Sequence, residues 1–290
     1  MYPFDPVIGR FSDRKRPFLY LNFITQFSQY NDKRICFILF YNRIMILLTG
    51  KPNTGKSTCI KTLIDLLGKQ RCGGFYTEEI LENGQRTGFR THTLSGRDFV
   101  FAHVDFPKEY AVEEFGVDIK TFEEIALNEL NDQTKEFLII DEIASMQLYS
   151  KRFEQLLIRL SEENRKIAAA ICEIDNDFTA SLKQKYRDHL HILTEKNRNG
   201  MPFVLAEELN EDDELYLSKL RLSETYARQP ERFHYEGGRI ILNSTHGIRT
   251  ITENCYGYHC TCDYYHDNGT CSHIMAVIRN RYKDRQSFTI

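Results

Sequence analysis

Residues 50–58 read GKPNTGKST and carry the side chains and glycines that bind phosphate in nucleotide-binding proteins. Glycines let the backbone approach a ligand closely, and consecutive N–H groups at the start of a helix attract negative charge. We expect Lys56 to reach the β- and γ-phosphates of a nucleoside triphosphate and the Ser57 hydroxyl to ligate Mg²⁺. The predicted nucleotide-binding residues here are Gly50, Lys51, Pro52, Asn53, Thr54, Gly55, Lys56, Ser57 and Thr58.

A second candidate feature is the apolar run FLIIDE at residues 137–142, which ends in two acids. Such acids can simply begin a solvated loop. After an upstream P-loop, however, the pattern is typical of a Walker B strand. We therefore expect Asp141 to hold the magnesium shell and Glu142 to orient or deprotonate a water molecule.

A third feature is the stretch HCTCDYYHDNGTCSHIMAV at residues 259–277. Three thiolates and one imidazole are a common closed zinc set, and the Asn-Gly turn between the two pairs lets them meet. The predicted structural zinc ligands are Cys260, Cys262, Cys271 and His273. Cys255, His259 or His266 could replace one of them, and buried free cysteines are the alternative to a metal site.

The elements around these motifs alternate between strands and helices. Residues 44–48 are an apolar strand before the P-loop, and residues 60–67 have helical spacing after it. Asn83-Gly84 between two strand-like runs predicts a hairpin. Alternation predicts an α/β fold with a mostly parallel sheet. Further strands are expected at 137–140, 167–171 and 191–193, and helices near 122–130, 153–160 and 178–186.

Composition restricts the remaining classes. The net charge of -3 argues against a chain coated with phosphate-binding Lys and Arg. The apolar run at residues 35–48 is interrupted by Asn42 and Arg43, so it predicts no membrane span. Eight cysteines without a secretory signal at the start predict a reducing, cytoplasmic setting.

The organisation along the chain predicts three parts. Residues 1–43 show no steady period and stay unassigned, although Met45 at the beginning of the first strand suggests a start there. Residues 44–205 are the expected P-loop domain. Residues 206–290 are a C-terminal region with a zinc-binding module at about 235–280. A module this small needs its metal to fold.

Six motifs, in order, resemble those of the nucleoside-triphosphatase family known from thermophiles and, in vertebrates, as the cancer-related nucleoside-triphosphatase. The resemblance covers residues 44–200 and implies a RecA-like P-loop domain that hydrolyses ATP, GTP and other nucleoside triphosphates with Mg²⁺. It places Asn197 and Arg198 near the nucleotide. Arg198 could stabilise transferring phosphate, stack on the base or make a surface ion pair. The motifs are GKPNTGKST, GGFYTEE (73–79), RTGF (86–89), FGVDIKTFEEIAL (115–127), IIDEIASMQL (139–148) and TEKNRN (194–199).

The C-terminal pattern resembles a SWIM-type zinc finger, which implies DNA or protein binding. A basic run follows it, namely Arg279, Arg281, Lys283 and Arg285, and could contact phosphates. We therefore consider two functions: a Mg²⁺-dependent nucleoside-triphosphatase whose zinc module recruits DNA or protein, and a nucleotide-dependent switch with slow or stimulated turnover. Neither hypothesis includes a membrane.

Overall fold

A nine-stranded sheet forms the centre of the structure. The computed structural model describes residues 44–254 and 257–286, so the predictions for residues 1–43 and for Cys255 lie outside the described residues. Five neighbouring strands are parallel and four antiparallel strands extend one side. In order across the sheet the strands are β5 (Ala111–Val112), β6 (Phe115–Val117), β4 (Asp98–His103), β3 (Gln85–Thr93), β2 (Cys72–Glu82), β7 (Phe137–Ile143), β8 (Lys166–Ile171), β1 (Ile44–Thr49) and β9 (Leu190–Ile192).

The parallel part confirms the prediction of an α/β fold with a mostly parallel central sheet. The predicted hairpin is also confirmed, because β2 and β3 pair antiparallel on either side of Asn83-Gly84. Both turn residues have positive φ, 51° at Asn83 and 79° at Gly84. A two-residue hairpin turn of the type that matches strand twist requires this conformation at both positions.

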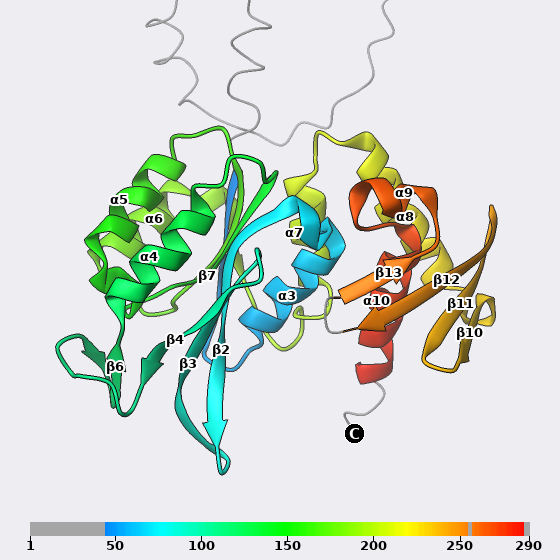
Figure 1. Cartoon of the computed structure of the whole chain (residues 1–290). Coiled ribbons are helices and arrows are strands. Elements are labelled where there is room, and N and C mark those ends of the chain that lie inside the picture. The colour runs from blue at the N-terminus through cyan, green and yellow to red at the C-terminus, as the bar shows by residue number, and fades with distance from the viewer. Residues whose placement is uncertain (1–43, 255–256, 287–290) are drawn as a thin grey trace, which may run out of the picture. The chain divides into compact units, whose positions relative to one another are not determined.

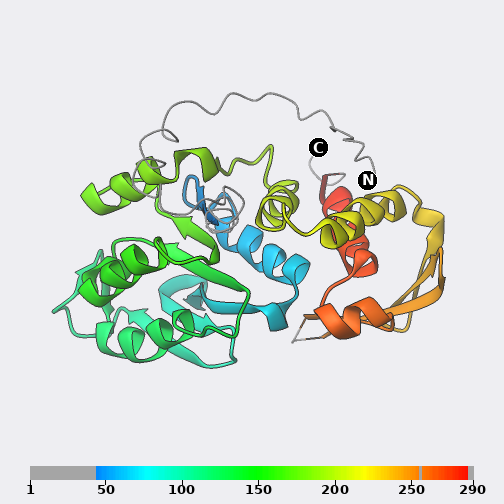
Figure 2. The same ribbon diagram turned by 90° about the horizontal axis from the view of Figure 1, so that it is seen from above.

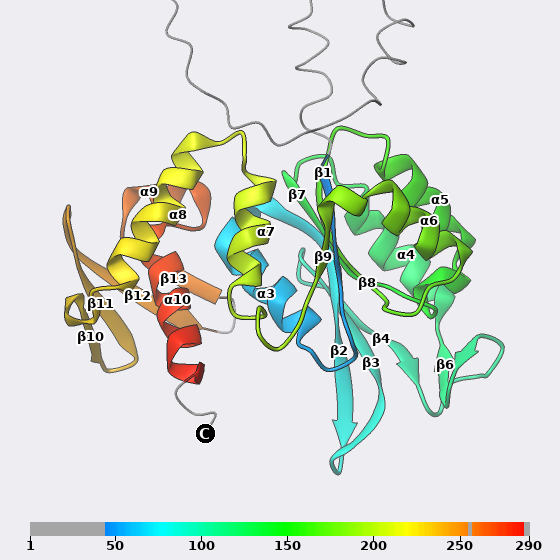
Figure 3. The ribbon, with the colours of Figure 1, turned by 180° about the vertical axis from the view of Figure 1, so that it is seen from behind.

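Helices cover both faces of the sheet, as Figures 1 and 3 show. Alternate β1 residues serve the two layers: Met45 and Leu47 join one buried cluster, Ile46 and Leu48 the other. The first layer contains α4 (Ile119–Leu130), α5 (Lys151–Leu160) and α6 (Asp177–Lys185); the second contains α3 (Lys56–Leu67) and α7 (Met201–Leu209). Short 3-10 turns are η1 (Lys69–Arg71), η2 (Gln147–Tyr149), η3 (Arg187–His189) and η4 (Pro230–Arg232).

The C-terminal region lies on the α3 side of the sheet, as the view from above shows (Figure 2). It begins with α8 (Glu214–Ala227) and continues into a four-stranded antiparallel sheet. The strands are β10 (Phe233–Glu236), β11 (Arg239–Ser244), β12 (Gly247–Asn254) and β13 (Gly257–Cys260), followed by α9 (Asp263–Asn268) and α10 (Ser272–Gln286).

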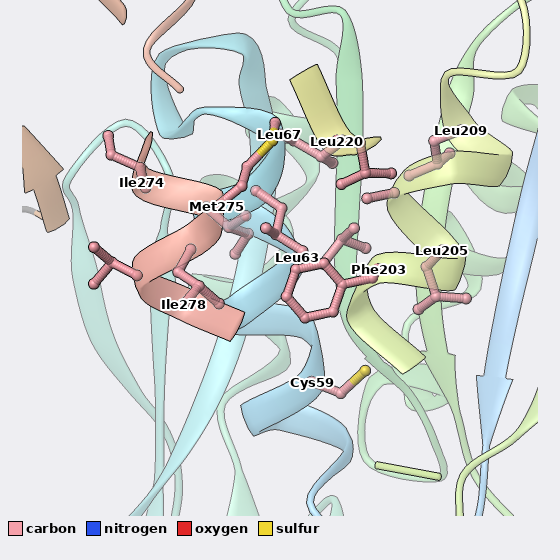
Figure 4. Packing of buried hydrophobic residues seen from close by; sticks show 14 of the residues in the cluster. Cys59, Leu63, Leu67, Phe203, Leu205, Leu209, Leu220, Ile274, Met275 and Ile278 are labelled. Carbon is pink, nitrogen blue, oxygen red and sulfur yellow. The ribbon is translucent and has the colours of Figure 1, made fainter. Parts of the chain in front are cut away.

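The helix α3 is enclosed by this C-terminal region. Leu63 and Leu67 pack in one buried cluster with Phe203, Leu220 and Met275, which come from α7, α8 and α10 (Figure 4). A helix that is apolar on nearly all sides must be buried on nearly all sides. The cluster therefore crosses the predicted boundary near residue 205.

Two polar contacts hold α8 and α10 against α3. The Tyr216 hydroxyl of α8 donates to the Leu66 carbonyl at 3.0 Å, and the Tyr282 hydroxyl of α10 hydrogen-bonds the Thr62 hydroxyl. Gly68, at φ 89°, ends α3 where a Cβ would lie 2.5 Å from the Asn268 carbonyl oxygen. The C-terminal region thus contacts the second half of α3, from Thr62 to Gly68. Across the described residues, no helix combines the length and apolarity that crossing a bilayer requires.

Candidate active site and metal-ligand cluster

The P-loop connects β1 to α3 at the carboxyl edge of the parallel strands. Gly55 is the N-cap of α3 with φ 97°, a left-handed conformation that favours glycine. Lys56 and Ser57 are the first helical residues, whose N–H groups have no acceptor within the helix. The Lys56 ammonium donates to the Gly50 carbonyl at 3.0 Å and so lies back over the loop. The loop thus has the backbone conformation and the free helix N–H groups that a phosphate-binding loop requires.

Asp141 and Glu142 lie at the end of β7, as predicted. Asp141 is buried, and neither of its carboxylate oxygens has a partner of normal hydrogen-bond geometry among the described residues. Burial, reinforced by the neighbouring Glu142 charge, raises the Asp141 pKa to about 7, although Ser57, Lys56 and Lys61 oppose the rise. Burial also raises the Glu142 pKa, against the lowering effect of Lys56.

These groups fit a bound Mg²⁺. A buried carboxylate without a partner is costly, and hard oxygen donors are what Mg²⁺ selects. The Ser57 hydroxyl, close enough to lower the Asp141 pKa, supplies a second oxygen. Asp141 and Ser57 are thus the residues that would hold the ion with a nucleotide, as the sequence predicts.

The raised Asp141 pKa predicts two effects of removing the carboxylate: the nucleotide-free protein becomes more stable, and Mg²⁺ with nucleotide no longer stabilises it. A pKa raised from 3.8 to about 7 means that folding favours the protonated carboxyl, so its contribution to stability is present below about pH 4 and is lost as pH rises through 7. We expect nucleotide-free Asp141→Asn to be more stable than wild type by a margin that grows between about pH 4 and pH 7 and reaches about 4 kcal/mol.

Urea unfolding in magnesium-free buffer at several pH values measures this margin. Added Mg²⁺ and nucleotide should raise the midpoint of wild type and leave Asp141→Asn unchanged. A variant that is less stable than wild type across the whole range would contradict the assignment of a strained, metal-directed carboxylate.

The loop at residues 194–199 borders the P-loop on the other side of β1. The Leu193 N–H donates to the Thr49 carbonyl at 2.7 Å, and a Cβ on Gly50 would lie 2.6 Å from the Leu193 carbonyl oxygen. Asn197 shapes the loop: its amide oxygen accepts from the Thr194 N–H and its amide nitrogen donates to the Ile192 carbonyl. Arg198 is exposed beside it and forms no ion pair among the described residues.

Three contributors to the site were not predicted from the sequence. The Thr77 hydroxyl donates to the Asp141 carbonyl at 2.9 Å, which fixes β2 against the end of β7. Lys61 pairs with Glu78, whose other oxygen lies 3.1 Å from His92. The Lys61 hydrogen bond lowers the Glu78 pKa. Lys61 stands four residues after Ser57, a helical spacing that could have placed it on the site's side of α3.

The four predicted zinc ligands also gather. Cys260 ends β13, Cys262 precedes α9, and Cys271 and His273 lie at the start of α10. One donor atom from each lies within 4.8 Å of the others, and all four residues are buried. The Cys260 sulfur is 3.7 Å from Nδ1 of His273. Hydrogen bonds from the thiols of Cys260 and then Cys271 hold the Cys262 pKa far below its usual value, and a thiolate is what zinc binds.

The alternatives to this ligand set are separate from it. His259 is exposed and packs edge-on against the Tyr265 ring, and the His266 side chain is 91% exposed. The His273 ring stacks on Tyr226 of α8 at 5.7 Å. Three buried thiols and one imidazole therefore fit a tetrahedral zinc ion.

Two arginines of the basic run after the cluster make contacts within the protein. Arg281 makes a two-pronged ion pair with Glu253 of β12. Arg279 donates from Nε to the Ser223 hydroxyl at 3.0 Å, and its guanidinium lies over the Phe203 ring. Both arginines are thus used inside the protein. The side chains of Lys283 and Arg285 lie outside the described residues.

Fold and site together define a P-loop nucleotide-binding α/β protein. A family profile described as NTPase matches residues 45–206, more than half of the chain. The chain belongs to this NTPase family.

Known relatives match a similar share of this chain. Nucleoside-triphosphatase THEP1 of Thermotoga sp. (strain RQ2) is 39% identical over 158 residues, 54% of this chain and 90% of that protein. The cancer-related nucleoside-triphosphatase of Homo sapiens is 29% identical over 173 residues, 54% of this chain and 91% of that protein. The crystal structure of THEP1 from Aquifex aeolicus superposes with a TM-score of 0.50 at 32% identity, covering 57% of this chain and 99% of that one.

Proposed function

We propose that this protein hydrolyses nucleoside triphosphates to the diphosphate and phosphate, using Mg²⁺. The observation that carries the proposal is the buried Asp141 carboxylate, which has no partner of normal hydrogen-bond geometry among the described residues and is influenced by Ser57 and Lys56 of a P-loop. The names of the relatives support the same activity. Bound Mg²⁺ would neutralise charge on the phosphate oxygens.

Each protein group has a separate task in this reaction. Lys56 exchanges the Gly50 carbonyl for a phosphate oxygen and stabilises the charge that develops there. Glu142 accepts a proton from water as the water oxygen bonds to the γ-phosphorus. The bond from that phosphorus to the bridging oxygen breaks, and the diphosphate leaves with its electron pair. In this proposal the exposed Arg198 offsets charge on the transferring group.

Replacing Lys56 by alanine is expected to lower kcat/KM for phosphate release by about 10²- to 10³-fold, because a preorganised cation is lost from the phosphates. Initial rates with ATP and GTP measure the effect. Lys151→Ala on α5, whose ammonium pairs with Glu154, is the matched control and should keep the wild-type rate. Wild-type turnover by Lys56→Ala would place the phosphate site elsewhere.

We further propose that the Cys/His cluster binds a structural zinc ion in a SWIM-like module. The donor set and its burial support this part. Recruitment of a protein partner is supported by Tyr235 and Ile248 on the four-stranded sheet, whose side chains are largely exposed. Recruitment of DNA has weaker support, since Arg281 is used in an ion pair with Glu253.

The alternative function, a nucleotide-dependent switch, makes a different kinetic prediction. Phosphate release is measured with and without duplex and single-stranded DNA. Strong unstimulated turnover supports the hydrolase. Slow turnover that rises when DNA is added would favour the switch and would also show that the module binds nucleic acid.

A further inference from the structure

A cavity of about 340 Å³ lies where α7, α8 and α10 meet. This volume is within the range of small-molecule sites. Only α7 belongs mostly to the segment matched by the NTPase family, which ends at residue 206. The cavity is therefore built in part by residues beyond that family's domain. Its lining includes Asn199, Gly200, Phe203, Arg228, Arg279 and Tyr282.

Two segments of the chain connect the cavity with the phosphate site. Asn199 directly follows Arg198 in the loop that starts beside Gly50. Tyr282 hydrogen-bonds Thr62, which lies one helical turn after Thr58 on the same side of α3. Both the loop and the P-loop helix thus lead from the phosphates to the cavity wall.

The strand order indicates the direction in which a nucleoside extends from the bound phosphates. The acids of β7 lie on one side of β1, beyond β8, where attacking water and metal are needed. On the other side are β9 and the loop at residues 194–199. A base and ribose attached to the phosphates therefore extend toward this loop, away from Asp141 and Glu142.

Arg279 gives the cavity a surface suited to a base. Its guanidinium carbon lies 3.9 Å from the centroid of the Phe203 ring. Among residues whose side chains are described, it pairs with no carboxylate, and only its Nε makes a hydrogen bond, to Ser223. Burial lowers its pKa, with Glu224 opposing that effect. A planar guanidinium held on an aromatic ring can stack on a nucleobase and donate to its acceptors.

We propose that this cavity receives the nucleoside part of the triphosphate and that Arg279 contacts the base there. The proposal rests on the hydrolase function above and adds to it that α8 and α10 complete the substrate site. The C-terminal region then contributes to nucleoside binding as well as to the packing of α3.

Binding of the full chain to two ligands tests the proposal. Calorimetry with Mg²⁺ compares the β,γ-imido analogues of ATP and GTP with inorganic tripolyphosphate, which has no nucleoside. We expect Arg279→Ala to weaken both analogues about tenfold or more and to leave tripolyphosphate affinity unchanged. Arg279→Lys, which keeps the charge and loses the planar group, should recover little. Arg221→Ala on α8, where Arg221 pairs with Glu214, is the matched control.

Three results would overturn the proposal: no change with any ligand, equal weakening of analogues and tripolyphosphate, or full recovery by Arg279→Lys. Equal weakening would show that Arg279 acts through the packing of α3. The readout is affinity, so absent phosphate release by wild type would refute the hydrolase without touching this result. Absent binding of either analogue to wild type would refute both.

Photolabelling of the wild-type protein with 8-azido-ATP gives a test that no folding defect can obscure. The azide is on the base, so the cross-link reports where the base lies. Labelled peptides from α8 or α10 would support the proposal. Labels on neither helix, with the cross-link confined to residues 44–209, would show that the base binds elsewhere.

Discussion

Replacing Glu142 by glutamine lowers the rate constant of phosphate release by about 10²- to 10⁴-fold, whereas affinity for Mg²⁺ and nucleotide stays close to wild type. The reason is a division of tasks between neighbours. Burial raises the Glu142 pKa, the Lys56 charge opposes that rise, and a raised pKa favours a carboxylate that accepts a proton from water. Glutamine has the same size and can still hold a water molecule, but it accepts no proton.

Single-turnover kinetics with equilibrium nucleotide binding separates the two effects. Glu154→Gln on α5, where Glu154 pairs with Lys151, is the matched control and should behave as wild type. Wild-type phosphate release by Glu142→Gln would assign the water-activating group to another residue. Loss of binding together with turnover would show that Glu142 serves the metal rather than the water.

We expect loss of the proposed zinc ion from the Cys/His cluster to destabilise the P-loop helix as well as the C-terminal region. Structural zinc sites supply about 10 kcal/mol or more of apparent binding free energy. Here the cluster sets the start of α10, whose Met275 shares a buried cluster with Leu63 and Leu67 of α3. We expect one zinc per chain, and a fall in Tm of more than about 10 °C when chelator removes it.

Cys260→Ser combined with Cys271→Ser should reproduce the loss, and hydrogen exchange should show faster opening of α3. Cys172→Ser is the control, because Cys172 lies in the P-loop part and far from the cluster in sequence. Metal analysis without zinc in protein purified without chelator would refute the site. Unchanged exchange in α3 after zinc loss would show that α3 does not depend on the cluster.

The packing of the C-terminal region around α3 changes the stability expected of a fragment that ends near residue 205. The boundary drawn from the sequence suggests a stable, active fragment. Leu209, Tyr216 and Leu220 would be missing from it, although all three are buried in the cluster that encloses α3. We therefore expect that fragment to be less stable than the full chain.

Local sequence patterns predicted much of the fold, because helices, strands and tight turns depend mainly on residues that are neighbours in the chain. The alternation of apolar strands with helical spacing predicted the α/β fold, and Asn83-Gly84 predicted the β2–β3 hairpin. The antiparallel extension β3–β4–β6–β5 was not predicted beyond its hairpin. Strand order depends on long-range pairing, which no local window contains.

The sequence by itself determined the chemistry that short spacing can encode: a phosphate loop from residue 50 to 58, two acids ending an apolar strand, and paired thiols with an imidazole. Only the tertiary structure decided what those groups face. It buried the Asp141 carboxylate with no partner of normal hydrogen-bond geometry among the described residues, set the Thr77 hydroxyl on the Asp141 backbone carbonyl, and set Arg279 on Phe203. Burial and pairing across more than 50 residues depend on how whole elements pack, because the free energy of those contacts exists only once α3 is enclosed.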